Sequence, residues 1–410
     1  MALPYTDVIQ QLVDALAGRI QRSVSVDEQH GGLIVSSRHF GDADKLRIDS
    51  VLSRRVPARV AEYLNSFGIA TADRPLSVPG NPSLGLVTRR CYPIRDHGRL
   101  LGYLWLIGDD AERFDEVVAD YVIQVSVRLH DRLLQVAEEE RRRRQLVADL
   151  LRGGEGCDRA ARELVGQGLV GPEDEVVVIA AGAGTDPEAV AAVLAETIGR
   201  GSPDAYAVRA LATSVGNRGA VLVAGRDEVE RAAAWLAEAI RHGVRRRDAD
   251  DGYTFVGLSN AGRLHLAPEL LRQAVLTAFV AAEFPELTPV LSWRGAGVYG
   301  PLMLAALASP DLVVPPQIVD LSAGGRTDSL AHTAEVFLDA AGDTATASEQ
   351  LMIHRTTLYY RLTRIEKKTG CDLKNGRDRL TLHLGLKMKR LLDSDIPAFL
   401  RQEQEPWESS

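Results

Sequence analysis

The chain has few cysteines and no long apolar run. Among its 410 residues, Cys91, Cys157 and Cys371 lie far apart and form no CxxC pair. This spacing argues against a disulfide framework or a cysteine metal cluster. No apolar stretch approaches the roughly 18 residues of a membrane-spanning helix, and Asp7 and Asp14 interrupt the N-terminus where a signal peptide would be apolar. We expect a cytoplasmic protein that contacts no membrane and needs no metal or cofactor.

Motifs of common enzymes are missing as well. The sequence contains no GxSxG, HExxH or P-loop motif. Gly182-Ala-Gly184 follows an apolar run but lacks the third glycine of a dinucleotide-binding loop. These absences predict a protein that is not an enzyme.

Lysine is scarce and unevenly placed in a chain that is acidic overall. Five of the six lysines fall between His354 and Leu392, where eleven Lys/Arg and three Asp/Glu give a charge of +8. Since the whole chain carries −8, the remainder carries −16. Basic charge gathered at one end of an acidic chain suggests a nucleic-acid-binding segment. A solvated helical face is the alternative, and charge alone does not separate the two.

The length, with 45% hydrophobic and 25% charged residues, predicts a soluble protein of two or three domains. The first, residues 1–112, combines an N-terminal helix with strands near 32–36 and 87–94. A tight turn at 96–98 leads into a further strand over 100–107. This pattern is typical of a small α+β domain.

One long helix over 114–151 follows, and we assign residues 113–153 to a connector. Its apolar residues Val118, Val122, Val125 and Leu129 form a heptad seam. An isolated surface helix would not need so persistent a seam. The pattern favours a contact between two copies of the chain over packing within one chain.

Two further domains complete the chain. Residues 158–300 alternate strands with helices at 187–199, 227–242 and 268–283, which predicts an α/β domain. Residues 326–393 read as almost entirely helical. The expected fold class is therefore a multidomain α+β protein with an all-α C-terminal domain.

This C-terminal domain contains a helix-turn-helix pattern. Asp343 is a good N-cap for a short helix, a break falls at 352–354, and Gly370 ends a second helix. The apolar face of the second helix holds Leu358, Leu362 and Ile365. Two helices joined by so short a break suit a helix that lies in the major groove.

The remaining surface of the second helix gathers hydroxyl and cationic groups. These are Arg355, Thr356, Thr357, Tyr360, Arg361, Arg364, Lys367 and Lys368. Arg364 can donate two parallel hydrogen bonds to a guanine edge, and the threonines can bond bases or phosphates. The other cations suit phosphate contact, which positions a protein without reading sequence. We therefore predict that this helix binds double-stranded DNA.

At these residues the chain resembles PucR/CdaR-type bacterial transcription regulators. Their turn reads roughly Ile-His-Arg-Asn-Thr-Leu-x-Tyr-Arg-Leu, which stands here as residues 353–362 with Thr356 in place of the asparagine. The following Thr-Gly stands at 369–370. The resemblance implies a transcription factor in which His354 and Arg361 support the turn and the DNA backbone. It also implies a last helix that packs behind the reader through Leu380, Leu384, Met388 and Leu391.

More loosely, residues 158–300 resemble the degenerate cyclase-like domain of these regulators. Active cyclases of that fold carry a Gly-Gly-acid-acid-Phe hairpin whose carboxylates hold metal. The corresponding hairpin, 213–220, has Asn217 and Arg218 where acids would be needed. The resemblance thus implies a structural or dimerising domain without bound Mg²⁺.

The N-terminal domain resembles a GAF-type sensor, mainly through residues 100–107 and the helix after them. Such domains enclose small ligands in an apolar pocket with a few polar groups. Cys91, Tyr92, Tyr103 and Trp105 are the candidate ligand contacts, and core packing is the alternative for an aromatic residue on a strand.

Together these features predict a DNA-binding transcriptional regulator that forms a homodimer or a higher homo-oligomer and is controlled by a small-molecule or redox signal at its N-terminal domain. Two-fold pairing predicts a pseudo-palindromic or repeated operator. One alternative is a cyclase-like nucleotide-signalling enzyme. Another is a scaffolding protein whose basic helix binds an acidic partner.

Overall fold

The computed structural model describes most of the chain between residues 4 and 394. Residues 30, 43, 45–52, 54–55, 182–185, 200–207, 217, 247–254, 285, 309–313, 315 and 322–329 lie outside the described part. The chain divides into two compact units, Met1–Arg141 and Arg142–Ser410. Among the described residues, no helix is both long and apolar enough to cross a bilayer.

The N-terminal unit is built on a five-stranded antiparallel sheet of order β2-β1-β5-β4-β3. Its strands are β1 (Val24–Glu28), β2 (Leu33–Ser36), β3 (Leu76–Val78), β4 (Arg89–Asp96) and β5 (Arg99–Ile107). The predicted turn joins β4 to β5 through His97 (φ 45°) and Gly98 (φ 83°). Two consecutive left-handed residues are what a two-residue hairpin with a type I′ turn requires. In this hairpin Cys91 lies opposite Trp105.

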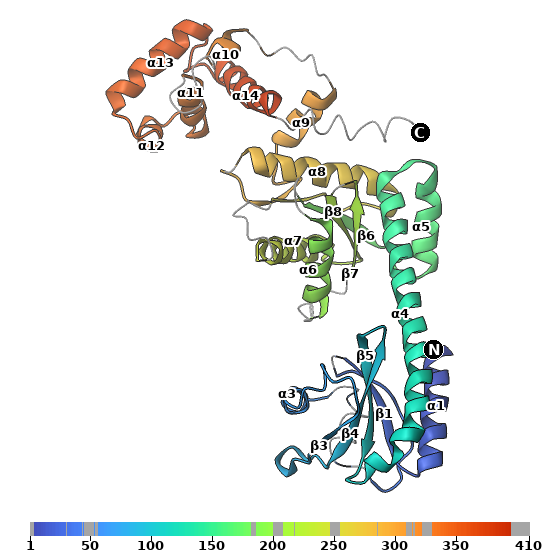
Figure 1. Ribbon diagram of the computed structural model, residues 1–410. Coiled ribbons are helices and arrows are strands. Elements are labelled where there is room, and N and C mark those ends of the chain that lie inside the picture. Colours follow the sequence, from blue (N-terminus) through green and yellow to red (C-terminus); the bar gives the residue numbers. More distant parts are fainter. Residues whose placement is uncertain are drawn as a thin grey trace. The chain divides into compact units, whose positions relative to one another are not determined.

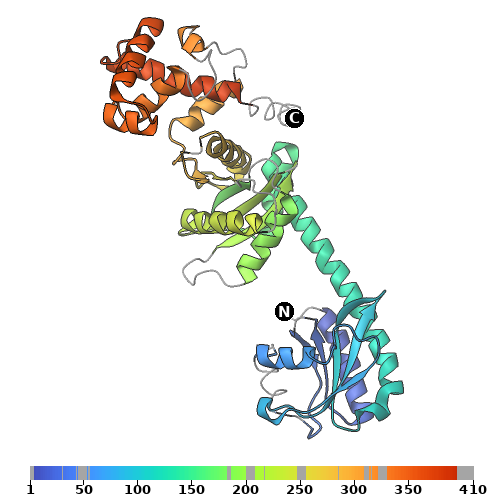
Figure 2. The same ribbon diagram turned by 60° about the vertical axis from the view of Figure 1, so that its left-hand side comes forward.

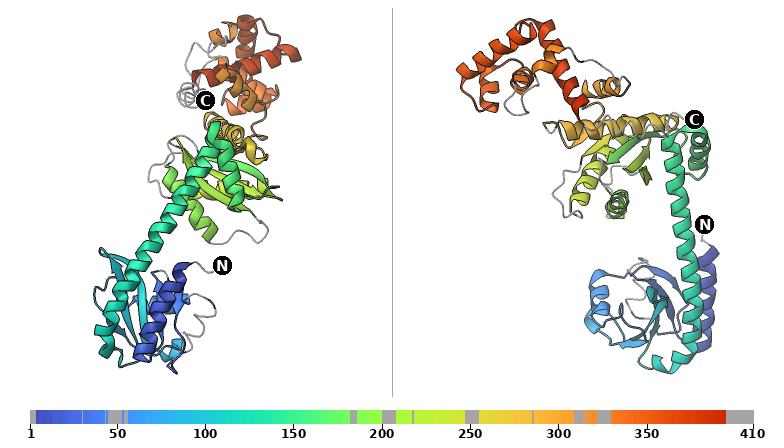
Figure 3. Two further views of the ribbon diagram at one scale, coloured as in Figure 1. Left: turned by 90° about the vertical axis from the view of Figure 1, so that its right-hand side faces the viewer. Right: turned by 45° about the horizontal axis from the view of Figure 1, so that its top comes forward.

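Helices cover both faces of this sheet. α1 (Pro4–Ile20) and the first half of α4 (Asp115–Arg152) run side by side over one face (Figures 1 and 3). The short helix α3 (Ala58–Asn65) packs over the other face. The turns η1 (Pro82–Leu84) and η2 (Ala111–Phe114) complete the unit. The sequence patterns predicted α1, α4 and the β4–β5 hairpin, whereas they missed β1, β3 and α3.

The heptad seam of α4 belongs to this unit's own core. Val118, Val125 and Leu129 are buried together with Ile94 and Leu104 of the sheet. The interpretation of this seam as a contact between two copies was therefore wrong, and packing within one chain is what the structure has. A seam of period 3.5 marks a buried face but does not say which surface buries it.

The second unit begins with an α/β layer on a sheet of order β10-β9-β6-β8-β7. Its strands are β6 (Glu175–Ala181), β7 (Arg209–Val215), β8 (Arg218–Gly225), β9 (Val256–Leu258) and β10 (Val290–Ser292). α5 (Cys157–Gly166), α8 (Ala267–Glu283) and the last turns of α4 cover one face. α6 (Pro187–Gly199) and α7 (Val229–Arg245) cover the other (Figure 2). The elements η3 (Gly154–Gly156), η4 (Leu264–Leu266) and α9 (Tyr299–Ala308) complete it.

The β7–β8 hairpin is the one that the sequence resemblance matched with the acidic hairpin of cyclases. Asn217 lies outside the described residues. Arg218 is buried, and its guanidinium lies 4.6 Å from the centre of the Phe279 ring. This arginine therefore points into the protein interior, toward α8.

The C-terminal domain consists of short helices around one apolar core. They are α10 (Pro316–Leu321), α11 (Leu330–Asp339), α12 (Thr344–Gln350), α13 (Arg355–Thr369) and α14 (Gly376–Asp393). α14 packs through Leu382 and Leu386, while Leu380 is largely exposed. Of the expected apolar row of the last helix, Leu391 is buried and Met388 packs against the core, so the expectation was wrong for the exposed Leu380. The helix itself does pack behind α13 in the shared core, as expected.

Candidate nucleic-acid interface

The break between α12 and α13 is held by local hydrogen bonds. The Asp343 carboxylate caps α12 by accepting from the Thr346 amide at 2.6 Å. His354 caps α13, because its Nδ1 accepts from the Thr356 amide at 3.3 Å. Gly370 ends α13 in the left-handed region, at φ 71°. Asp343 and Gly370 stand where the sequence predicted them, and His354 lies in the predicted break. Together these residues fix the length and direction of α13.

Met352 occupies the position in the break where many such turns have glycine. Its backbone is left-handed, at φ 52°, and its side chain is 91% exposed. A residue with a Cβ adopts this conformation at a cost of about 1–2 kcal/mol. The capped helices on both sides hold the break in place despite this strain.

α13 buries one face and exposes the other. Leu358, Leu362 and Ile365 lie in the core of the domain. The exposed face carries Arg355, Thr356, Thr357, Tyr360, Thr363, Arg364 and Lys367. We call this set the α13 face. The Arg364 guanidinium lies 5.9 Å from the centre of the Tyr360 ring, a cation–π contact that orders the arginine along the helix.

Two predicted DNA contacts lie off this face. Arg361 Nη1 donates to Thr333 Oγ1 of α11 at 3.1 Å. Lys368 Nζ donates to the Asp320 carbonyl of α10 at 3.2 Å. Both side chains thus brace α13 against its neighbours, and their contact with phosphate stays a prediction.

The comparisons with known proteins agree with this geometry. A family model described as the PucR C-terminal helix-turn-helix domain matches residues 330–388, from the start of α11 into α14. The DNA-binding transcriptional activator AdeR of Bacillus subtilis (strain 168) is 23% identical over 406 residues, which cover 94% of either protein. Residues 330–388 therefore form a PucR-type helix-turn-helix domain, and the chain is similar over most of its length to a transcriptional activator.

Two further relatives are also regulators. The proline-responsive transcriptional activator PutR of B. subtilis (strain 168) is 22% identical over 401 residues, covering 93% of this chain and 96% of that protein. The purine catabolism regulatory protein of the same strain is 36% identical over 64 residues, 16% of this chain and 12% of that protein. These relatives are transcriptional regulators and not enzymes, which agrees with the expectation from the sequence.

One solved structure matches this chain with a lower sequence identity than these relatives. The regulator of polyketide synthase expression from Bifidobacterium adolescentis is 16% identical, and the match covers 61% of this chain and 91% of that chain. The TM-score of 0.29 is too low to establish a common overall fold.

The regulator's four candidate ligand contacts divide between the two faces of the N-terminal sheet. Cys91, Tyr103 and Trp105 are buried together beneath α3. Tyr92 lies on the opposite face, where its hydroxyl donates to the Asp115 carboxylate of α4 at 2.8 Å. Successive residues of a strand point to opposite faces, so Tyr92 does not join the other three.

Cys91 does not have the properties of a redox-sensing thiol. Burial raises the pKa of the Cys91 thiol, and the charge of Asp27 raises it further. A thiol that stays protonated and lies out of contact with solvent reacts slowly with oxidants. This argues against Cys91 as the sensor of the predicted redox signal.

Sequence reasoning missed a buried arginine beside these residues. Arg89 lies on the same face as Cys91, is 7% exposed, and donates from Nη2 to the Asp44 carboxylate. Burial lowers the pKa of Arg89, and Asp44 partly offsets this effect. Arg89 Nε and Trp105 Nε1 are buried and find no hydrogen-bond acceptor among the described residues. The sequence did offer one signal for this site, because Arg89 stands two positions before an apolar residue that faces the same side of the strand.

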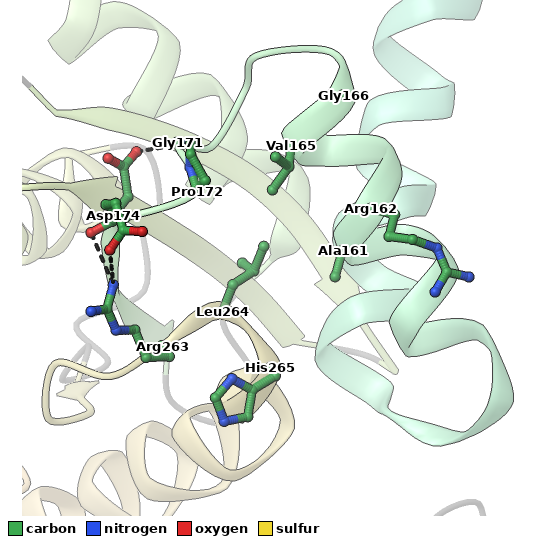
Figure 4. Close-up of a pocket in the computed structure, with 11 residues that line it drawn as sticks. Ala161, Arg162, Val165, Gly166, Gly171, Pro172, Asp174, Arg263, Leu264 and His265 are labelled. Carbon is green, nitrogen blue, oxygen red and sulfur yellow. Dashed lines mark hydrogen bonds and ion pairs between the residues drawn. The ribbon is translucent and has the colours of Figure 1, made fainter.

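The α/β layer of the regulator contains an open cavity of about 670 Å³ (Figure 4). Ala161, Val165 and Leu264 form its apolar wall. Two of its charged side chains bond to the backbone, since Arg263 donates to the Glu173 carbonyl at 3.1 Å and Asp174 accepts from the Gly171 amide at 2.6 Å. None of the predicted site residues lines this cavity.

Proposed function

We propose that this protein is a homodimeric regulator whose α13 face reads the major groove of its operator in response to a small molecule at the N-terminal domain. The observation that carries the proposal is the α13 face itself: hydroxyl groups and a guanidinium exposed together on a helix that two caps fix at the edge of a packed domain. A reading helix needs this combination of rigid backbone and exposed donors.

Roles within the α13 face follow from chemistry. Arg364 suits a guanine edge through two parallel hydrogen bonds, and Thr357 suits a base or the thymine methyl group. Arg355 and Lys367, at the two ends of the helix, suit the phosphates on either side of the groove. Thr356 stands where relatives have asparagine, which changes the contact made at the start of the helix.

We further propose four domains in this order: a GAF-like sensor at 1–112, a connector at 113–153, a degenerate cyclase-like domain at 158–300 and a DNA-binding domain at 326–393. The turn of Arg218 toward Phe279 supports a structural role for the third domain. A protein with these domains would bind its effector and its operator with one chain.

A second apolar row on α4 supports the homodimer. Ile123, Val127 and Leu134 are 62%, 51% and 57% exposed, and their spacing of four and seven residues places them on one side of the helix. Exposed apolar rows of this kind mark protein–protein contacts. A second copy of α4 offers the same row in a two-fold arrangement, which places two reading helices on one DNA.

The proposed phosphate contacts are tested by the dependence of DNA affinity on salt concentration. Arg355 and Lys367 of two protomers give four phosphate contacts, so log K should fall against log [salt] with a slope of about −3.6. Lys367→Gln should weaken binding to promoter and unrelated DNA alike and bring the slope to about −1.8, because each dimer loses two contacts. Gel-shift titrations at several salt concentrations measure both quantities.

Arg272→Gln is the matched control, because Arg272 is an exposed cation of α8 outside the C-terminal domain. It should leave the slope unchanged. Equal competition by unrelated DNA and by the protein's own promoter region would contradict sequence-specific reading and favour a scaffolding protein with an acidic partner.

The sensor part of the proposal rests on the two unsatisfied donors, Arg89 Nε and Trp105 Nε1. A buried donor without an acceptor costs about 1–3 kcal/mol, so a small molecule that brings an acceptor oxygen would be bound there. The relative PutR is described as proline-responsive. A small effector that bears a carboxylate would supply the acceptor that these two donors lack.

Trp105→Phe tests this site, because it removes the N–H donor and keeps most of the apolar ring. L-Proline and a series of small carboxylic acids, each with its primary amide, are screened for a rise in Tm. An effector that stabilises the wild type should bind the variant about 5- to 150-fold more weakly, the equivalent of one buried hydrogen bond. Trp235→Phe in α7 should bind it normally. Equal binding by Trp105→Phe would rule out this site.

A further inference from the structure

A buried lysine connects the two helices at the back of the C-terminal domain. Lys387 of α14 is 3% exposed. Its Nζ lies 2.7 Å from Glu335 Oε1 and 2.9 Å from Asp339 Oδ2, both on α11. The same Nζ lies 3.8 Å from Glu286 Oε1, which follows α8 in the α/β layer. Lys387 thus lies within ion-pair distance of carboxylates from both the C-terminal domain and the α/β layer.

Arg390 of α14 extends this contact into the α/β layer. Its Nε donates to Glu283 Oε1 at 3.0 Å, and its Nη2 donates to the Glu283 carbonyl at the end of α8. Its Nη1 lies 3.4 Å from Glu286 and from Glu335. The guanidinium also lies 4.4 Å from the centre of the Phe284 ring. One side chain therefore joins the end of α8 to α11 and α14.

Apolar contacts surround these charges. Leu391 is buried in the same cluster as Phe284 and Met303 of the α/β layer. The Phe284 and Tyr299 rings are 4.3 Å apart at their centres, and Lys387 Nζ lies within 6 Å of both. Because the Lys387 and Glu335 side chains are only 3% and 16% exposed, their ion pair is screened less than a surface pair would be.

The carboxylates could suggest a metal site, but a lysine occupies it. Oxygens of Glu286, Glu335 and Asp339 lie within 4.8 Å of one another. Lys387 Nζ is the cation among them. Burial lowers the pKa of Lys387, but hydrogen bonds to Glu335 and Asp339 outweigh this and raise it, so the ammonium keeps its charge at neutral pH.

We propose that Lys387, Arg390, Glu283, Glu286, Glu335 and Asp339, the interdomain ion cluster, fix the orientation of the DNA-binding domain on the α/β layer. Arg390 and Glu283 are its positioning residues, since neither lies on the α13 face. Buried ion pairs add little net stability and are best suited to selecting one arrangement over others. The consequence for DNA rests on the proposed function: two half-sites at one spacing are read together only if each reading domain is held rigidly.

Arg390→Met tests the cluster without DNA. Methionine keeps the aliphatic contact with Phe284 and removes every ion pair of Arg390. Hydrogen exchange at residues 283–287 and 386–392 of the full-length protein should become at least about tenfold faster, because the contact opens locally. Arg390→Lys retains the charge and should restore slow exchange. Lys389→Met, which removes a lysine of α14 paired with Asp393 of the same helix, should have no effect.

A DNA measurement then separates orientation from folding. The wild type should bind a promoter duplex with both half-sites more tightly than a duplex with one. In Arg390→Met this ratio of affinities should fall about tenfold, a typical coupling between linked sites. Affinity for the single half-site should stay at the wild-type value, whereas a merely unstable domain would lose both.

Unchanged exchange in Arg390→Met and in a second variant, Glu283→Gln, would overturn the proposal. So would faster exchange with an intact half-site advantage. If the wild type itself shows no preference for promoter DNA, the proposed function fails, and the exchange measurement still decides whether the cluster fixes the domain.

Discussion

Replacement of Arg364 and Thr357 together by alanine is expected to abolish specific recognition of the promoter. Each lost base contact costs about 1–3 kcal/mol, or roughly five- to 150-fold in Kd. Both side chains are exposed, so their removal leaves the core of the domain intact. Fluorescence anisotropy with labelled promoter DNA measures the loss, and affinity for unrelated DNA should fall far less because Lys367 and Arg355 remain.

Thr381→Ala with Lys389→Ala provides the matched control. It removes one hydroxyl and one cation from α14 of the same domain, away from the α13 face. Wild-type affinity is expected for this control. Wild-type affinity in the Arg364/Thr357 variant would show that the α13 face does not read the promoter.

Replacement of Val127 and Leu134 by glutamate is expected to convert the protein to a monomer and to lower promoter affinity by about 10²- to 10⁴-fold, the contribution of a second linked binding site. The two residues lie on the exposed row of α4 and make little contact within their own unit. A charged residue in a dimer contact is left unpaired and desolvated, which is strongly unfavourable. Sedimentation velocity gives the mass, and anisotropy gives the affinity.

Val298→Glu with Val319→Glu is the control for this change, because both valines are exposed and lie outside α4. The control should remain dimeric. A dimeric Val127/Leu134 variant would show that the second copy binds elsewhere, and a monomer with undiminished affinity would show that one reading helix is enough.

The features of the candidate site that depend on neighbouring residues could be predicted from sequence. Asp343, His354 and Gly370 act within a few residues of their own position, so their spacing fixes the limits of α12 and α13. The apolar arc of Leu358 and Ile365 follows from the helical period alone. For this reason the break and the orientation of the α13 face follow from the order of the residues.

Features that depend on distant partners could not be predicted. Charge counting treats the eleven cations of the last segment alike, yet Lys387 and Arg390 face acids 52 and 107 residues away. The pair of Arg89 with Asp44 joins residues 45 apart. The seam of α4 was recognisable as a buried face, but only the fold reveals that β4 and β5 bury it. A periodic pattern gives the face of an element and not its neighbour.

The central claim is that the α13 face lies in the major groove, and methylation interference tests it most directly. Methylation of guanine N7 changes the edge that an arginine reads there. The account predicts that methylated guanines in each half-site block binding of the wild type, and that one of these guanines no longer matters to Arg364→Ala. An identical pattern for both proteins, or interference confined to adenine N3 in the minor groove, would contradict it.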